Sequence, residues 1–208
     1  MQKKKEGKKL KNIIFLVDTS GSLYSNKISS VNATLVECMG VIRHKVMNKT
    51  DLAVYYGEFN ENMNPIVRHR NIVDENIPNF ETKEENGFYK LTLFSKLYDG
   101  LADFFEAKKY EEGDFLIILL TDGKAIDSMR YEAKLNRTKN IKQFRDAIKI
   151  VARVGGSITS SSQDLFEFVD NNANRIIEIS SLANELDSLI FDGDEGNSSD
   201  SFYNSIFK

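Results

Sequence analysis

Hydrophobic residues follow two patterns that alternate along the chain. Apart from Asn12, residues 12–17 and 115–120 are continuous runs of aliphatic and aromatic side chains, a pattern typical of strands buried on both faces of a sheet. Residues 25–48 and 92–108 instead place apolar side chains three or four positions apart, which predicts helices with one buried face. The chain is therefore expected to form a sheet covered by helices.

The rest of the chain continues this alternation. Its apolar pattern predicts three more buried strands, at 51–59, 147–154 and 175–179, and two more helices, at 163–171 and 181–191. Residues 65–73 alternate apolar and polar side chains, as a half-exposed edge strand does. Residues 74–89 are rich in Glu, Asn and Pro and are expected to be mostly loop. Residues 129–145 have few apolar positions and suit a surface helix, or a long loop and a helix.

This order of elements predicts a doubly wound α/β fold. We expect a mostly parallel six-stranded sheet with one antiparallel edge strand at 65–73 and helices on both faces. In such folds, ligands bind at the carboxyl ends of the strands, where the strand order reverses. The informative side chains should therefore follow the strands at 12–17 and 115–120.

Charge is unevenly distributed along the 208 residues, although the formal net charge is only −3. Residues 1–11 contain six Lys and one Glu, a basic arm of charge +5. Residues 192–208 form an acidic, polar tail of charge −3, which leaves −5 on the predicted domain at 12–191. An acidic body argues against nucleic acid as the main partner, because phosphate contacts need a basic face.

Composition narrows the class of protein further. Cys38 is the single cysteine, which excludes a disulfide framework and a cysteine-rich zinc site. The longest apolar runs are far too short to span a bilayer, and the basic N-terminus lacks the apolar region of a secretory signal. We therefore expect a cytoplasmic protein that does not enter the membrane.

Two polar clusters follow the two strands singled out above. They are Asp18–Ser22, directly after Val17, and Thr121–Gly123, directly after Leu120. Each cluster alone would suit a turn or a helix cap. Together, at the ends of two buried strands, their carboxylate and hydroxyl oxygens favour a site for Mg²⁺, Mn²⁺ or Ca²⁺.

These residues carry a family resemblance. Asp18–Ser22 matches the D-x-S-x-S motif of von Willebrand factor A domains, which opens their metal-ion-dependent adhesion site, and Asp122-Gly123 matches the family's D-G after the fourth strand. Thr92, before the second large helix, resembles the family's third-site threonine. The similarity covers about residues 11 to 191, and the segment at 164–189 resembles the stand-alone bacterial domains found with tellurium-resistance and related stress systems.

The resemblance implies a metal site and a kind of partner. Ser20, Ser22 and Thr92 would ligate the cation, and Asp18 and Asp122 would act mainly through water. Because neutral hydroxyls form most of that inner shell, the cation keeps charge to attract an Asp or Glu of a protein partner. The implied function is therefore metal-dependent protein binding without catalysis, in a bacterial stress response or multi-protein assembly.

Two departures from the family keep alternatives open. Tyr89-Lys90-Leu91 precede Thr92 where relatives have small residues, and Lys124 to Asp127 replace a Pro-Thr-Asp-like run, with Asp127 as the candidate matching acid. Lys90 or Lys124 would add positive charge at the rim of the metal site. One alternative is a scaffold whose metal site is vestigial. Another is a metal-assisted phosphotransferase or hydrolase with Asp18 as nucleophile, although Ser20 stands where a second carboxylate would be needed.

Overall fold

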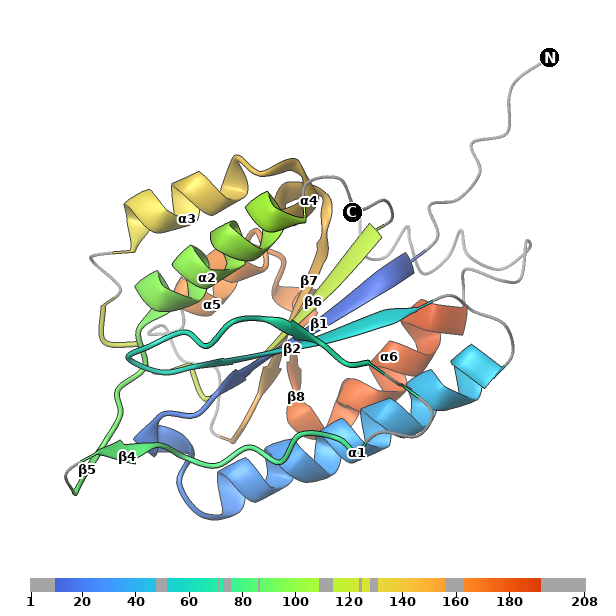
Figure 1. Cartoon of the computed structure of the whole chain (residues 1–208), viewed down its shortest axis with the longest axis horizontal. Coiled ribbons are helices and arrows are strands. Elements are labelled where there is room, and N and C mark those ends of the chain that lie inside the picture. The colour runs from blue at the N-terminus through green and yellow to red at the C-terminus, as the bar shows by residue number, and fades with distance from the viewer. Residues whose placement is uncertain are drawn as a thin grey trace.

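The computed structural model describes residues 10–47, 52–70, 72, 76–85, 87–108, 114–123, 125–127, 131–155 and 163–191. The first nine residues of the predicted basic arm and the whole acidic tail lie outside these described residues. Within them, one six-stranded sheet with the order β3-β2-β1-β6-β7-β8 lies between two layers of helices (Figure 1).

The sheet is parallel except at one edge. The strands are β1 (Leu10–Asp18), β2 (Ala53–Phe59), β3 (Val67–Arg68), β6 (Asp114–Thr121), β7 (Ile148–Arg153) and β8 (Ile176–Glu178). Only the β2–β3 pair within it is antiparallel. The predicted α/β fold with one antiparallel edge strand is therefore confirmed, although β3 is shorter than the segment predicted at 65–73.

Helices cover both faces of the sheet (Figure 1). One face carries α1 (Asn26–Met47) and α6 (Leu182–Phe191), and the other carries α2 (Phe94–Ala107), α3 (Glu132–Lys139), α4 (Lys142–Asp146) and α5 (Gln163–Phe168). Short 3₁₀ turns η1 (Gly21–Leu23), η2 (Ala173–Arg175) and η3 (Ile179–Ser181) connect these elements. No helix in the described part of the chain is long and apolar enough to cross a membrane.

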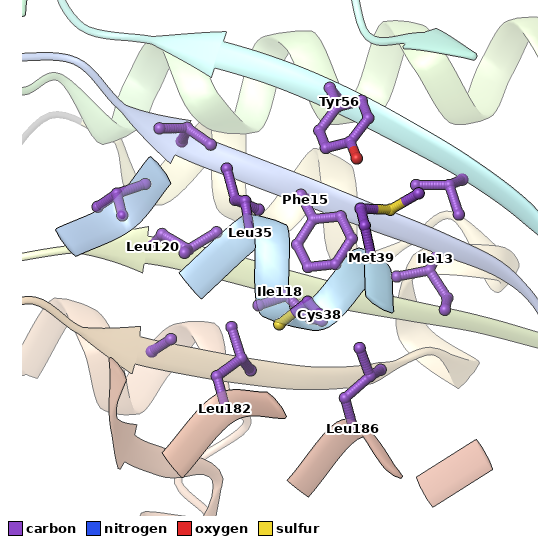
Figure 2. Packing of buried hydrophobic residues seen from close by; sticks show 14 of the residues in the cluster. Ile13, Phe15, Leu35, Cys38, Met39, Tyr56, Ile118, Leu120, Leu182 and Leu186 are labelled. Atoms are coloured by element: carbon purple, nitrogen blue, oxygen red, sulfur yellow. The ribbon is translucent and has the colours of Figure 1, made fainter. Parts of the chain in front are cut away.

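The central strands bury side chains on both faces, which explains their continuous apolar runs. Along β1, Phe15 packs into the core under α1 and α6, whereas its neighbours Ile14 and Leu16 belong to the core under α2. Figure 2 shows the first of these cores, in which Phe15 and Tyr56 lie beside Met39 of α1. Two such cores hold β1 and β6 rigidly at the centre of the sheet.

Two regions differ in detail from the sequence-based expectation. The segment expected to be mostly loop contains a small antiparallel hairpin of β4 (Glu84–Glu85) and β5 (Phe88–Tyr89). Strands of two residues show no periodicity, so the pattern could not reveal them. The segment at 129–145 holds two short helices, α3 and α4, rather than one.

A buried acid–phenol cluster ties α5 to the start of α3. The hydroxyl of Tyr131 lies 2.6 Å from Asp164 Oδ1 and 2.9 Å from Glu167 Oε2. A phenol has one proton to donate, so both contacts are hydrogen bonds only when one carboxyl is protonated. Burial raises the pKa of Asp164, and the hydrogen bond from Tyr131 opposes this only in part.

Replacing Asp164 with Asn should change how stability depends on pH. A raised carboxyl pKa in the folded state favours folding at low pH, and this contribution is lost as pH rises from the ordinary value of 3.8 through the raised pKa. Urea unfolding between about pH 4 and about pH 7 should show Asp164→Asn gaining stability relative to wild type as pH rises. A difference that stays constant across this range would contradict the assignment.

Candidate metal centre

The site lies where the direction of the strand order reverses. Asp18 ends β1 and Asp122 directly follows β6, and these strands are parallel neighbours with Val17 paired to Leu120. From β1 the sheet continues to β2 on one side, and from β6 to β7 on the other. The two carboxylates thus end at the same edge of the sheet, at the position where α/β folds bind ligands.

The segment Asp18–Ser22 sends alternate residues to opposite sides. Its first, third and fifth side chains join the site, as described below. Thr19 instead accepts a hydrogen bond from Asn60 Nδ2 at 3.0 Å, which holds the segment to the end of β2. The amide of Gly21 donates to the carbonyl of Lys90 at 2.9 Å, which holds it to the β4–β5 hairpin.

The three hydroxyls form a chain of hydrogen bonds that ends on a carboxylate. Thr92 Oγ1 donates to Ser20 Oγ at 2.7 Å, and Ser20 Oγ lies 3.0 Å from Ser22 Oγ. Ser22 Oγ then donates to Asp122 Oδ1 at 2.9 Å. Thr92 Oγ1 also lies 3.3 Å from Asp18 Oδ2. The structure therefore brings all five residues expected from the sequence into one cluster.

Asp18 is fully buried and held by donors on both of its oxygens. The amide of Ser20 donates to Oδ1 at 2.9 Å, and Thr121 Oγ1 donates to Oδ2 at 2.6 Å. Burial raises the pKa of Asp18, whereas the hydrogen bonds from Thr121 and Ser20 lower it in part. A nearby positive charge would favour the ionised form of this carboxyl.

Asp122 is paired with a lysine that the sequence did not single out. Lys27 Nζ lies 2.9 Å from Asp122 Oδ2 and 3.0 Å from the carbonyl oxygen of Ser22. Of the two lysines considered from the sequence, Lys90 pairs with Glu85, and Lys124 lies outside the described residues. Lys27 was missed because it reads as an ordinary polar position of α1, far in sequence from Asp122.

Asp127, the candidate matching acid, caps a helix. Its carboxylate accepts hydrogen bonds from the amides of Phe94 at 2.8 Å and Ser95 at 2.9 Å, the first residues of α2. The amide of the preceding Ile126 donates to the carbonyl of Thr92 at 3.1 Å. Since α2 amides lack partners within their own helix at this end, Asp127 fixes α2 and thereby positions Thr92.

The donor set suits a hard divalent cation. Every converging side-chain donor is an oxygen, which Mg²⁺, Mn²⁺ and Ca²⁺ prefer. In the part of the chain that the structure describes, no three His, Cys, Asp or Glu side chains form a group able to hold a metal, so such a site depends on the hydroxyls. Cys38 packs in the apolar core under α1 and α6, where burial raises the pKa of its thiol to about 12.

Comparison with known proteins finds similarity in structure only. No protein-family model and no curated protein matches the chain by sequence. Its structure is similar to a von Willebrand factor type A protein from Catenulispora acidiphila, with a TM-score of 0.58 and 14% identity over 89% of this chain and 43% of that one. The chain thus spans less than half of that protein's length.

Two further solved structures are similar over most of the chain. One is an aerotolerance-related membrane protein from Bacteroides fragilis, with a TM-score of 0.58 and 14% identity over 86% of this chain and 98% of that one. The other is the manganese-loaded TRAP protein of Plasmodium vivax, with a TM-score of 0.58 and 17% identity over 88% of this chain and 74% of that one.

The chain has a von Willebrand factor A-type fold. The similarity to these solved structures, together with the mostly parallel six-stranded sheet, confirms the expectation for the fold. Identities of this size show the fold alone. The assignment of metal ligands therefore depends on the side chains themselves.

The close contact between Gly21 and the β4–β5 hairpin leaves no room for a side chain at residue 21. A Cβ at Gly21 would lie 2.2 Å from Tyr89 Cβ, so Gly21→Ala must displace the hairpin or the Asp18–Ser22 segment. Overpacking of this kind costs about 1–3 kcal/mol, measured as the free energy of unfolding in urea. The control is Gly40→Ala in α1, where a Cβ meets nothing within 4 Å. This substitution should stabilise the helix by about 1 kcal/mol. Equal effects of the two changes would contradict the close packing.

Proposed function

We propose that this chain is a metal-dependent protein-binding module. A divalent cation, Mg²⁺ or else Mn²⁺ or Ca²⁺, would be held by Ser20, Ser22 and Thr92 together with Asp18 and Asp122, and its open coordination position would take a carboxylate from an Asp or Glu of a protein partner. The observation that carries this proposal is the convergence of three hydroxyls and two carboxylates at the ligand-binding edge of the sheet.

The chain's own residues set the charge of the proposed site. The hydroxyls of Ser20, Ser22 and Thr92 are neutral donors of lone pairs, so they leave a cation's charge largely intact. Asp18 directs its oxygens to the Ser20 amide and the Thr121 hydroxyl, which spreads its negative charge over these donors. The arrangement thus favours binding an additional anionic group over full neutralisation within the chain.

Exposed apolar side chains lie on the segments that carry these polar groups and on the β4–β5 hairpin that contacts Gly21. We call them the apolar rim: Tyr24, Phe88, Tyr89, Leu91 and Ile126. The rings of Tyr24 and Tyr89 lie 5.0 Å apart, and Phe88 is 78% exposed. Large exposed apolar side chains around a polar centre are typical of protein interfaces. The apolar rim therefore supports a protein as the partner.

Two solved neighbours are consistent with parts of this proposal. The Plasmodium vivax TRAP structure is described as manganese-loaded, so this fold can carry a divalent cation. The Bacteroides fragilis neighbour is described as aerotolerance-related. Together with the resemblance of residues 164–189 to tellurium-resistance-associated domains, it motivates our proposal of a bacterial stress-response setting.

A scaffold that binds partners without metal is the second candidate. The contact between Lys27 and Asp122 favours it, because an ammonium group can stand in for part of a cation's charge. Catalysis at Asp18 has less support. Its carboxylate is fully buried and hydrogen-bonded on both oxygens, whereas a nucleophile must reach its substrate. We therefore propose a non-enzymatic role.

Removing one hydroxyl or one carboxylate from the site should weaken metal binding. We expect isothermal titration with Mg²⁺ or Mn²⁺ to show that Ser20→Ala and Asp18→Asn each lose about tenfold or more in affinity, equivalent to about 1.4 kcal/mol. The control is Ser30→Ala, a serine on the exposed face of α1, which should bind as wild type does. Equal binding by all four chains would refute the metal assignment.

The apolar rim should affect partner binding but not metal binding. Pull-downs with Mg²⁺ and with a chelator define the proteins that the wild type holds only when metal is present. Phe88→Ser should retain these about tenfold less, because it removes an exposed aromatic contact, while its Mg²⁺ affinity stays unchanged. Val36→Ser, at an exposed apolar position of α1, is the control. Retention of the same proteins with chelator would favour the metal-free scaffold.

A further inference from the structure

Lys27 places a positive charge on the candidate metal centre. Its Nζ contacts Asp122 Oδ2 at 2.9 Å and the Ser22 carbonyl oxygen at 3.0 Å. The Asp122 side chain is only 2% exposed, whereas that of Lys27 is 36% exposed. The salt bridge is therefore covered on the acid's side and open to solvent on the lysine's side.

This contact leaves Asp122 without a free oxygen. Oδ2 is paired with Lys27, and Oδ1 accepts the hydrogen bond from Ser22. A divalent cation entering between Ser20 and Ser22 would meet an ammonium group that is already bound to Asp122. Like charges a few ångströms apart repel each other, so the two cations compete for the same carboxylate.

The position of Lys27 gives no benefit to its own helix. Lys27 is the second residue of α1, and the first turn of a helix disfavours positive charge because the amide groups there already carry partial positive charge. The contacts with Asp122 and Ser22 therefore account for its orientation. The side chain is a flexible four-carbon chain with a single charge, so the ammonium can leave Asp122 while α1 stays in place.

We propose that Lys27 is a tethered competitor of the divalent cation. It neutralises Asp122 in the metal-free chain and gives up this carboxylate when a cation binds. The proposal rests on the proposed function and adds a regulation to it. Lys27 lowers metal affinity and keeps the metal-free site folded, so the protein becomes competent to bind its partner only at a sufficient concentration of the cation.

The test compares Lys27→Met, which keeps the length of the side chain and removes its charge, with Lys27→Arg, which keeps the charge. Isothermal titration with Mn²⁺ should show an affinity about tenfold higher in Lys27→Met than in wild type, and no gain in Lys27→Arg. A second readout is thermal unfolding. In chelator, Lys27→Met should melt below wild type, because Asp122 loses its partner, and added Mn²⁺ should raise its melting temperature more than that of wild type.

The outcomes separate this inference from the proposed function. Equal Mn²⁺ affinity in wild type, Lys27→Met and Lys27→Arg would overturn the competition and leave the proposed function intact. If Lys27→Met binds Mn²⁺ but wild type and Lys27→Arg do not, the competition is supported and metal-dependent binding in the natural chain is contradicted. Absence of binding in all three folded chains would overturn both. Lys27→Gln provides a second uncharged variant if Lys27→Met fails to fold.

Discussion

Two carboxylates buried side by side set the main physical constraint on this structure. Asp18 ends β1 and Asp122 directly follows the neighbouring parallel strand β6 at the centre of the sheet, so both carboxylates lie at the same edge. Buried charge is unfavourable unless it is hydrogen-bonded or paired with a cation. Hydrogen-bond donors around the two carboxylates stabilise this buried charge. They include Thr121, the hydroxyls of Ser20, Ser22 and Thr92, and the ammonium group of Lys27.

The surrounding elements hold these donors in place. Two apolar cores fix β1 and β6, and α2 is held at its start by Asp127. The β4–β5 hairpin contacts the Asp18–Ser22 segment through the close approach at Gly21. The backbone of this site, which comes from three separate parts of the chain, thus has little freedom to move. When a cation binds or leaves, the adjustment must therefore come from side chains such as Lys27.

The sequence predicted the parts of the structure that depend on local pattern. Continuous apolar runs identified the central strands, and the resemblance of Asp18–Ser22, Asp122 and Thr92 to the von Willebrand A motif identified side chains that the structure brings together. The contact of Lys27 with Asp122 joins residues 95 positions apart, and a lysine at the start of a helix has no pattern that reveals such a partner. The helix-capping role of Asp127 depends likewise on how two distant segments meet.

Both proposals concern which cation occupies the edge of the sheet beside Asp122. The most direct measurement is anomalous diffraction from crystals of the full chain soaked in Mn²⁺. The account predicts a peak about 2.0–2.6 Å from the hydroxyl oxygens of Ser20 and Ser22, the range of oxygen ligands to such cations, with Lys27 Nζ displaced from Asp122. An empty position between these hydroxyls, with Lys27 still bound to Asp122 at saturating Mn²⁺, would contradict it.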